Sequence, residues 1–216
     1  MIQLHFSPST ASMVPHILLE ELGVAYERVA VDRAANAHKS PDYLRLNPNG
    51  LIPVLVDRDL VLYETAAIVL HLCDHHPGAG LAPAPGTPLR SQFYKWLVWL
   101  TNTLQATLIV YFYPERWVDA GNAEGVAQVR RHAHGKVVGL LGQLEDQLAS
   151  HAGPWFLGEH YTALDAYVLT LCRWTRNFDS GRARDLPRLG AYLRRVLERP
   201  AVQRTFANEQ LQPPFV

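Results

Sequence analysis

The sequence predicts an α/β domain with the element order βαβαββα, followed by a domain built only of helices. Through residue 75, apolar residues alternate between short strand-like runs and helical spacing, whereas from residue 89 onward only helical spacing remains. Between these parts, residues 76–88 hold four prolines and three glycines, a composition that interrupts both patterns. We therefore expect a first domain over residues 1–78, a linker over 79–87 and an all-helical domain over 88–216.

The elements of the first domain are each marked by the spacing of their apolar residues. In chain order they are a strand over residues 2–6, a helix over 12–22, a strand over 26–31, a helix over 40–46, a hairpin of two strands over 53–62 and a helix over 64–75. Gly23 is typical of the end of a helix. Ser40 followed by Pro41 is typical of an N-cap and a first helical turn.

The second domain shows five segments with helical periodicity. They cover residues 89–117, 124–150, 163–178, 187–198 and 200–208. Before the third segment, Thr162 and Asp165 have the spacing of a capping box, in which the acidic side chain reaches back to the N-cap backbone. We expect this pair to stabilise the start of a buried helix and to take no part in catalysis.

The charge balance argues against a nucleic-acid or membrane partner. Lys plus Arg and Asp plus Glu number 20 each, so no general attraction to phosphates or anionic lipids is expected. The first residues lack the basic and apolar regions of a leader, and no later run approaches the roughly 20 apolar residues that span a bilayer. We expect a cytoplasmic protein.

The metal-ligating residue types do not form a recognisable site. Cys73 and Cys172 fall in different domains and in apolar helical segments, so we interpret both as core thiols without a disulfide. His132 and His134 are two residues apart on an expected helix and therefore face different directions. The sequence thus predicts no metal site.

The most informative segment is the expected hairpin together with the helix start after it. Pro53 stands at the first position of a strand, where its missing N–H costs no ladder bond. If the Ile52–Pro53 bond is cis, the N–H and C=O of Ile52 face outward, and an extended ligand can bind there as an added strand. Glu64 and Thr65 begin a helix, whose free N–H groups attract an anion. A carboxylate-bearing ligand is therefore expected between the two features.

Two motifs resemble those of the glutathione transferase superfamily, in particular its bacterial beta class. Residues 6–23 are similar to the first strand and first helix of beta-class members, and Asn47-Pro48-x-Gly50-x-Ile52-Pro53-Val54-Leu55 is similar to their central motif. The resemblance covers nearly the whole chain. It implies a thioredoxin-like first domain, an all-helical second domain, glutathione as co-substrate without a metal, and a homodimer. The activity that it implies is conjugation of the glutathione thiolate to small hydrophobic electrophiles.

The resemblance also implies contacts for the tripeptide. Ile52, held by Pro53, would pair with the cysteinyl backbone, while Glu64 and Thr65 would hold the γ-glutamyl end. Lys39, or less readily His38, lies where related proteins place a basic residue for the glycyl carboxylate. Structural roles without a ligand stay open for these residues. Pro53 can lie at the edge of a strand, Glu64 can cap a helix, and Lys39 can be a solvated surface lysine.

The loop before the first helix departs from the beta class. Beta-class members carry a cysteine where this chain has Ala11, so a mixed disulfide with glutathione is not possible at that position. Three hydroxyls remain as donors to a thiolate held at the helix N-terminus. Ser12 and Thr10 are equally favoured and Ser9 is third. The alternative for Ser12 is that it only caps the helix.

An acceptor pocket is indicated by aromatic residues of the second domain. Tyr111, Phe112 and Tyr113 are consecutive in the sequence, so on a helix their side chains cannot all face the protein core. Trp174 is a further candidate for an apolar pocket, together with Phe178 one turn later. Gln105 occupies a position where beta-class relatives have a histidine that points toward the sulfur.

Two other functions stay open at this point. Glutathione can add to a substrate and leave again, as in an isomerase or a peroxidase. The chain can also be a regulatory module that binds glutathione without turnover, an alternative that Ala11 makes more serious.

Overall fold

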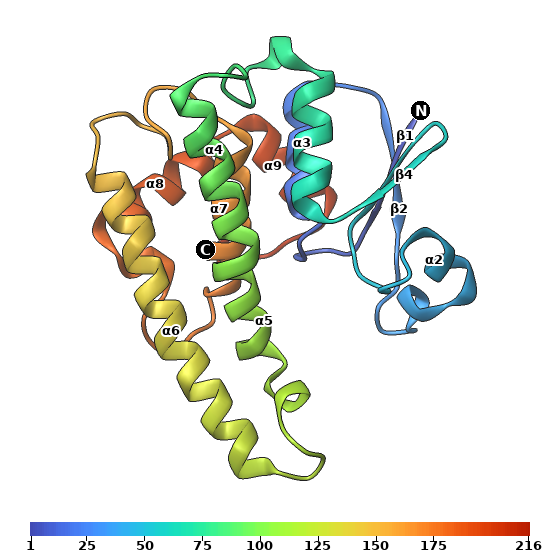
Figure 1. The fold of residues 1–216 in the computed structure, drawn as a ribbon, viewed down its shortest axis with the longest axis vertical. Helices are drawn as coiled ribbons and strands as arrows, with labels where there is room; N and C mark the ends of the chain where they lie inside the picture. Colours follow the sequence, from blue (N-terminus) through green and yellow to red (C-terminus); the bar gives the residue numbers. More distant parts are fainter.

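The computed structural model describes residues 1–216 and places a sheet with its helices beside a larger group of helices (Figure 1). The first part contains β1 (Ile2–Phe6), α1 (Met13–Leu22), β2 (Tyr26–Ala30), α2 (Pro41–Leu46), β3 (Val54–Asp57), β4 (Leu60–Tyr63) and α3 (Thr65–His75). The βαβαββα order expected from the sequence is confirmed. Each expected boundary lies within one residue of the observed one. The expected hairpin range also included the short loop between its two strands.

The sheet has the strand order β2-β1-β3-β4. β1 pairs in parallel with β2 because α1 crosses over between them, and it pairs antiparallel with β3. The tight turn between β3 and β4 makes that pair antiparallel as well. In the centre of the sheet, Leu4 of β1 lies opposite Leu55 of β3, and both side chains are fully buried.

The second part is entirely helical. It contains α4 (Pro88–Trp99), α5 (Ala106–Phe112), α6 (Ala123–Ala149), α7 (Ala163–Trp174), α8 (Pro187–Leu197) and α9 (Pro200–Asn208). None of these helices combines the length and the apolar character that crossing a bilayer requires.

The expectation of one regular helix over residues 89–117 is wrong in two respects. A π-helical segment, Leu100–Gln105, separates α4 from α5. The helix then ends at Phe112, because Tyr113 precedes Pro114 and adopts φ −128° instead of a helical value. Residues 114–117 form only a 3₁₀ turn. The third expected segment also ends earlier, at Trp174 rather than at residue 178.

Helix α7 lies at the centre of the helical part, and its start is fixed by Asp165. This fully buried carboxylate accepts from the N–H of Thr162 at 2.7 Å and from the N–H of Phe156 at 2.9 Å. The hydroxyl groups of Thr162 and Tyr192 donate to it at 3.2 and 2.8 Å. Buried polar groups are stable only when paired in this way. The acidic half of the expected capping box is therefore confirmed, with a role in stability.

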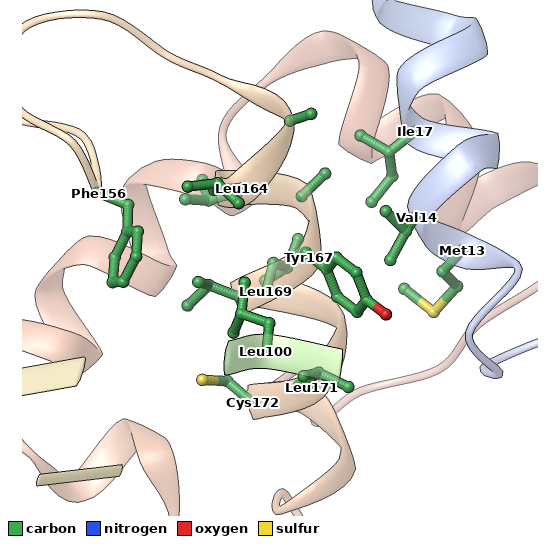
Figure 2. Close-up of a cluster of buried hydrophobic side chains, with 14 of the residues drawn as sticks. Met13, Val14, Ile17, Leu100, Phe156, Leu164, Tyr167, Leu169, Leu171 and Cys172 are labelled. Carbon is green, nitrogen blue, oxygen red and sulfur yellow. The ribbon is translucent and has the colours of Figure 1, made fainter. Parts of the chain in front are cut away.

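The sheet part and the helical part share one hydrophobic core of 41 buried residues. Figure 2 shows Met13, Val14 and Ile17 of α1 facing Tyr167 and Leu171 of α7. All five side chains have no solvent-exposed surface. This packing fixes the N-terminus of α1 against the helical part, which places the loop before α1 beside the helices.

Candidate active site

The loop before α1 borders a cavity of about 660 Å³ that both parts of the chain line. We call it the α1 cavity. Its walls are residues 9–11, 33, 38–39, 49–52, 105, 109, 111–113, 116, 174 and 176–178. Of the residues expected at the site, it brings together Ser9, Thr10, Lys39, Ile52, Gln105, Tyr111, Phe112 and Trp174.

Free backbone donors lie at the α1 end of this cavity. The N–H groups of Thr10 and Ala11 donate no hydrogen bond within the chain, although their carbonyl groups accept from Met13 and Val14. They belong to the unpaired donors that precede a helix. Together with the positive end of the α1 dipole, they create an environment that stabilises an anion such as a thiolate.

The three hydroxyls expected at this loop differ in their positions. Ser12 has 0% exposed surface, and its Oγ donates to the carbonyl oxygen of Ser7 at 3.0 Å. It makes no capping hydrogen bond to α1 and does not line the cavity. Thr10 Oγ1 donates to the same carbonyl at 2.8 Å but does line the cavity. Ser12 therefore lies behind the cavity surface and Thr10 lies at it, and the capping alternative for Ser12 is not observed. Which hydroxyl donates to a bound thiolate stays a prediction.

The backbone at Ser9 is held by a residue from the far end of the chain. Ser9 has φ +61°, and its N–H donates to Oε2 of Glu209 at 2.9 Å. The other oxygen of Glu209 accepts from Nδ1 of His16 at 2.8 Å, and both side chains of this pair are fully buried. No sequence signal points to Glu209, because it lies 200 residues from Ser9 and follows an amphipathic helix without a recognisable motif.

The opposite wall is an extended backbone segment that ends at Pro53. The Ile52–Pro53 bond is cis, and the N–H and C=O of Ile52 form no hydrogen bond within the chain. The neighbouring carbonyl of Leu51 accepts from Tyr43 Oη at 2.8 Å and from Asn47 Nδ2 at 2.9 Å. These two hydrogen bonds fix the segment through the carbonyl of Leu51. The N–H and C=O groups of Ile52 therefore remain available to an extended ligand.

Lys39 packs closely against the same segment. Its Nζ donates to the carbonyl of Asn49 at 3.3 Å. Gly50 has φ +60°, and a Cβ there would lie 2.7 Å from Lys39 Nζ and 2.8 Å from the carbonyl oxygen of His38. Only glycine fits this position. The predicted basic residue is thus placed beside Ile52 by a turn that the Asn-Pro-x-Gly motif provides.

Glu64 and Thr65 line a second cavity of about 670 Å³, which we call the α3 cavity. Gln105 and Ile109 line both cavities, so the two adjoin. The structure therefore does not bring Glu64 into one cavity with Ile52, as the sequence suggested, but into the next one. Glu64 has φ +72°, a strained value for a residue with a side chain. Such strain is frequent at ligand sites.

Aromatic side chains form the third wall of the α1 cavity. Tyr111 and Phe178 have ring centroids 4.4 Å apart, and Phe112 and Trp174 lie 6.3 Å apart. Tyr113, the third residue of the aromatic run, lines the cavity as well. Their position beyond the loop before α1 gives the cavity an apolar region next to the free N–H donors.

Gln105 lies in the π-helical segment between α4 and α5. Its side-chain oxygen accepts from the hydroxyl of the buried Tyr167 at 2.6 Å, which orients the amide. Single π turns inside helices are frequent at functional sites, since the extra residue redirects the side chains that follow. Gln105 therefore lies between the two cavities, and its amide is held by a residue that lines the α3 cavity.

The cavity also contains residues that the sequence analysis did not identify. Arg33, Arg116 and Arg176 line it, each from a different loop or turn. Arg176 follows the last residue of α7 by two positions, next to aromatic residues that were identified. The position of Arg176 in the sequence does not predict that it lines a cavity. The direction of its side chain depends on where α7 ends, at Trp174.

Comparisons with known proteins find one family in both parts of the chain. Residues 1–74 match the family model for the glutathione S-transferase N-terminal domain, and residues 127–195 match that for the glutathione S-transferase C-terminal domain. Among curated proteins, glutathione S-transferase 3 of Zea mays is 32% identical over 204 residues. That alignment covers 91% of this chain and 89% of the maize protein.

Solved structures show the same similarity over the full length. A glutathione transferase from Methylococcus capsulatus is 32% identical with a TM-score of 0.83, covering 98% of this chain and 100% of that chain. A glutathione transferase homolog from Sulfitobacter, solved with bound glutathione, is 25% identical with a TM-score of 0.87. It covers 98% of this chain and 99% of that chain.

Proposed function

Since the chain belongs to the glutathione S-transferase family, we propose that it binds glutathione in the α1 cavity and conjugates the glutathione thiolate to small hydrophobic electrophiles. The observation that carries this proposal is the pair of unpaired N–H groups of Thr10 and Ala11 at the N-terminus of α1. They lie in one cavity with the free backbone groups of Ile52 and with an aromatic wall.

The chain activates the thiol by stabilising its ionised form. The dipole of α1 and the N–H groups of Thr10 and Ala11 favour the thiolate over the thiol, so the pKa of the bound thiol falls. Thr10 adds its hydroxyl as a donor from the edge of the cavity. Ala11 cannot form a covalent bond to sulfur, so the thiolate stays free to attack an electrophile.

The rest of the tripeptide extends from the thiol in two directions. Ile52 offers one N–H and one C=O to the cysteinyl backbone, and Lys39 offers a cation to the glycyl carboxylate. The γ-glutamyl end passes Gln105 to the α3 cavity, where Thr65 begins α3 and Glu64 matches the ammonium group. The two adjoining cavities therefore suit one ligand that spans both.

The electrophile occupies the aromatic region of the α1 cavity. Rings of Tyr111, Phe112 and Trp174 give it apolar contact area and exclude water from the reacting atoms. The thiolate forms a C–S bond to the electrophilic carbon. A leaving group on that carbon departs with its bonding electron pair, whereas an epoxide or an enone keeps the displaced electron pair on its own oxygen, which then takes a proton from water.

Glutathione binding and turnover should be measured separately. Calorimetric titration of the purified protein with glutathione is expected to show one site per chain, and the bound thiol is expected to ionise below the pKa of free glutathione. Conjugation is then assayed with chlorodinitrobenzene and with epoxide and enone electrophiles. Absence of glutathione binding would overturn the proposal.

Other outcomes identify the alternatives. Binding without consumption of thiol against every electrophile class indicates a regulatory module. Reduction of a hydroperoxide, or conversion of an isomer without net loss of glutathione, indicates a peroxidase or an isomerase instead.

A further inference from the structure

The walls of the α1 cavity carry a net positive charge, although the positive and negative charges of the whole chain balance. Lys plus Arg and Asp plus Glu are balanced at 20 each. Yet the walls of the cavity hold four side chains with a permanent positive charge and no Asp or Glu at all. The four are Arg33, Lys39, Arg116 and Arg176. His38 is a fifth basic residue, but burial and the nearby Lys39 and Arg33 lower its pKa, so we do not count it among the permanent charges.

None of these four cations is part of a salt bridge. The chain forms seven ion pairs, and all of them lie elsewhere. Asp32 and Glu115 adjoin Arg33 and Arg116 in the sequence, but neither carboxylate lines the cavity. Arg33, Lys39 and Arg116 are exposed to solvent, whereas Arg176 is only partly exposed. Four cations without a carboxylate partner around one cavity give that cavity a positive potential, which favours an anionic ligand.

Arg176 is the most informative of the four. Its guanidinium is partly buried, and its only hydrogen bond runs from Nη1 to the carbonyl oxygen of Arg173 at 3.0 Å. Burial without a carboxylate partner lowers its pKa. Four of its five N–H donors therefore remain for a ligand, and a guanidinium binds a carboxylate through two parallel hydrogen bonds.

The arginines lie against the aromatic wall. Arg176 stands between Trp174 and Phe178 in the chain, and all three line the cavity. Arg116 stacks on the ring of Tyr113, with its Cζ 4.0 Å from the ring centroid. Nη2 of Arg33 donates to the hydroxyl of the same tyrosine at 3.0 Å. Flat apolar surface and bidentate cationic donors thus occur in the same part of the cavity.

Glutathione alone does not neutralise this charge. In its thiolate form it carries two carboxylates, one ammonium group and one negatively charged sulfur. Two of the four positive charges of the cavity therefore remain unbalanced after it binds. Lys39, beside Ile52, is placed for the glycyl carboxylate, whereas Arg116 and Arg176 lie at the aromatic residues.

We propose that the electrophile is an aromatic compound that carries a carboxylate or another anionic group, with Arg176 and Arg116 binding the anion. This inference rests on the proposed function and narrows its substrate class. The ring packs on Tyr111 and Phe112, the electrophilic carbon faces the thiolate, and the anionic group takes no part in the covalent step. Carbon–sulfur bond formation releases the leaving group with its electron pair, as for any electrophile of this class.

A matched pair of electrophiles tests the proposal. A chlorodinitrobenzoate and the corresponding chlorodinitrobenzamide differ in one substituent, a carboxylate in place of a neutral carboxamide, and their uncatalysed rates with glutathione correct for the difference in intrinsic reactivity. We expect the normalised kcat/KM of the wild-type protein to favour the benzoate by about tenfold, equivalent to one charge-assisted contact. Raising the ionic strength should reduce the ratio, since salt screens exposed charges.

Variants locate the anion site. R176Q should remove most of the preference for the benzoate, measured as the ratio of the two normalised rates in the same variant, and R116Q should act in the same direction. R188Q is the matched control, because Arg188 is exposed, lines neither cavity and forms no side-chain hydrogen bond. It removes the same charge from the chain and should preserve the ratio. Equal normalised rates for the two electrophiles in the wild-type protein would overturn the proposal, as would a ratio unaffected by R176Q and R116Q together.

A binding experiment separates this proposal from the proposed function. Calorimetry compares glutathione with S-(carboxybenzyl)glutathione and S-(carbamoylbenzyl)glutathione, which need no turnover. If glutathione itself does not bind, the proposed function fails and the inference fails with it. If glutathione binds but the two conjugates bind equally, only the anionic substrate class is refuted. Tighter binding of the carboxybenzyl conjugate, lost in R176Q, supports the class even without catalysis.

Discussion

Thr10 and Ser12 share one acceptor in the loop before α1, and this arrangement assigns them different roles. Both hydroxyls donate to the carbonyl of Ser7, and their oxygens lie 2.9 Å apart. Because Ser12 alone keeps that carbonyl satisfied, the hydroxyl of Thr10 can turn toward a thiolate without leaving a buried acceptor unpaired. In the proposed function, Ser12 would then be a positioning residue behind Thr10 as the donor.

Replacing Thr10 with valine tests this assignment. The change keeps the shape of the side chain and removes its donor, so the pKa of bound glutathione should rise by about one to two units, as expected for one hydrogen bond to a charged group. The measurement is a pH titration of the thiolate absorbance of the bound tripeptide. T10S should keep the wild-type value.

Ser12→Ala provides the comparison at the neighbouring hydroxyl. It should lower the free energy of unfolding by about 1 kcal/mol while changing the thiol pKa less than T10V does. An unchanged thiol pKa in T10V would show that the backbone N–H groups and the α1 dipole act alone. A larger shift in S9A than in T10V would identify Ser9 as the donor.

The two cysteines are buried thiols that line neither cavity. Burial raises the pKa of Cys73 to about 12, and burial also raises the pKa of the fully enclosed Cys172. Burial therefore favours the un-ionised thiol in both residues, and the thiolate is the reactive form. We expect iodoacetamide to label neither residue in the native protein and both in denaturant, as measured by mass spectrometry. Rapid native labelling of Cys73 would contradict its buried position.

At the scale of elements, a residue at the end of α9 holds the loop before α1 through hydrogen bonds. Glu209 follows α9 and binds the N–H of Ser9 and the ring of His16 at once. Its carboxylate therefore connects the last helix, the first helix and the edge of the α1 cavity.

Replacing Glu209 with alanine should affect stability and binding together. The loss of a fully buried, doubly bonded carboxylate should lower the free energy of unfolding by about 3 kcal/mol. The KM for glutathione should rise because the loop becomes less ordered. Denaturant unfolding and steady-state kinetics measure the two effects. E198A, on the exposed surface, should change stability by less than about 0.5 kcal/mol. An E209A protein that is destabilised but keeps its KM would show that the contact serves folding only.

At the scale of the whole molecule, the two parts of the chain fold around one core. The cluster of 41 residues crosses the proposed division at residues 79–87. Arg199 donates from Nη2 to Glu21 at 2.7 Å, and Arg204 donates from Nε to Glu20 at 2.6 Å, so ion pairs also connect α1 to α9 and its neighbourhood. The division into domains stays a prediction about architecture, and the shared core suggests one cooperative unfolding transition.

Association of two chains also stays a prediction, and the surface of α4 offers its test. Val98 is 55% exposed and Tyr94 is 44% exposed on this helix, and Val61 of β4 is 40% exposed. If these apolar side chains meet a second copy, sedimentation should give twice the chain mass. V98E should then favour the single chain, because a charge would be buried at the contact. A191E, on the exposed side of α8, places the same charge elsewhere and should leave the dimer intact. A wild-type protein that sediments as a single chain would refute the prediction.

The sequence by itself determined the elements of this protein and one wall of the cavity that we propose as its site. Apolar spacing and the glycine and proline positions located the strands and most helices, and Ile52, Gly50 and Lys39 could be identified because a local motif holds them. These signals act over a few residues and are therefore readable in the chain.

Only the tertiary structure decided the rest. It buried Ser12, placed Glu64 in the adjoining cavity, tied Ser9 to Glu209 across 200 residues, and gathered unpaired arginines beside the aromatic wall. None of these outcomes follows from local spacing, since each depends on where distant helices end and on which side chains they leave exposed. Local propensity determines which secondary structure a segment forms, whereas tertiary packing determines which residues its side chains contact.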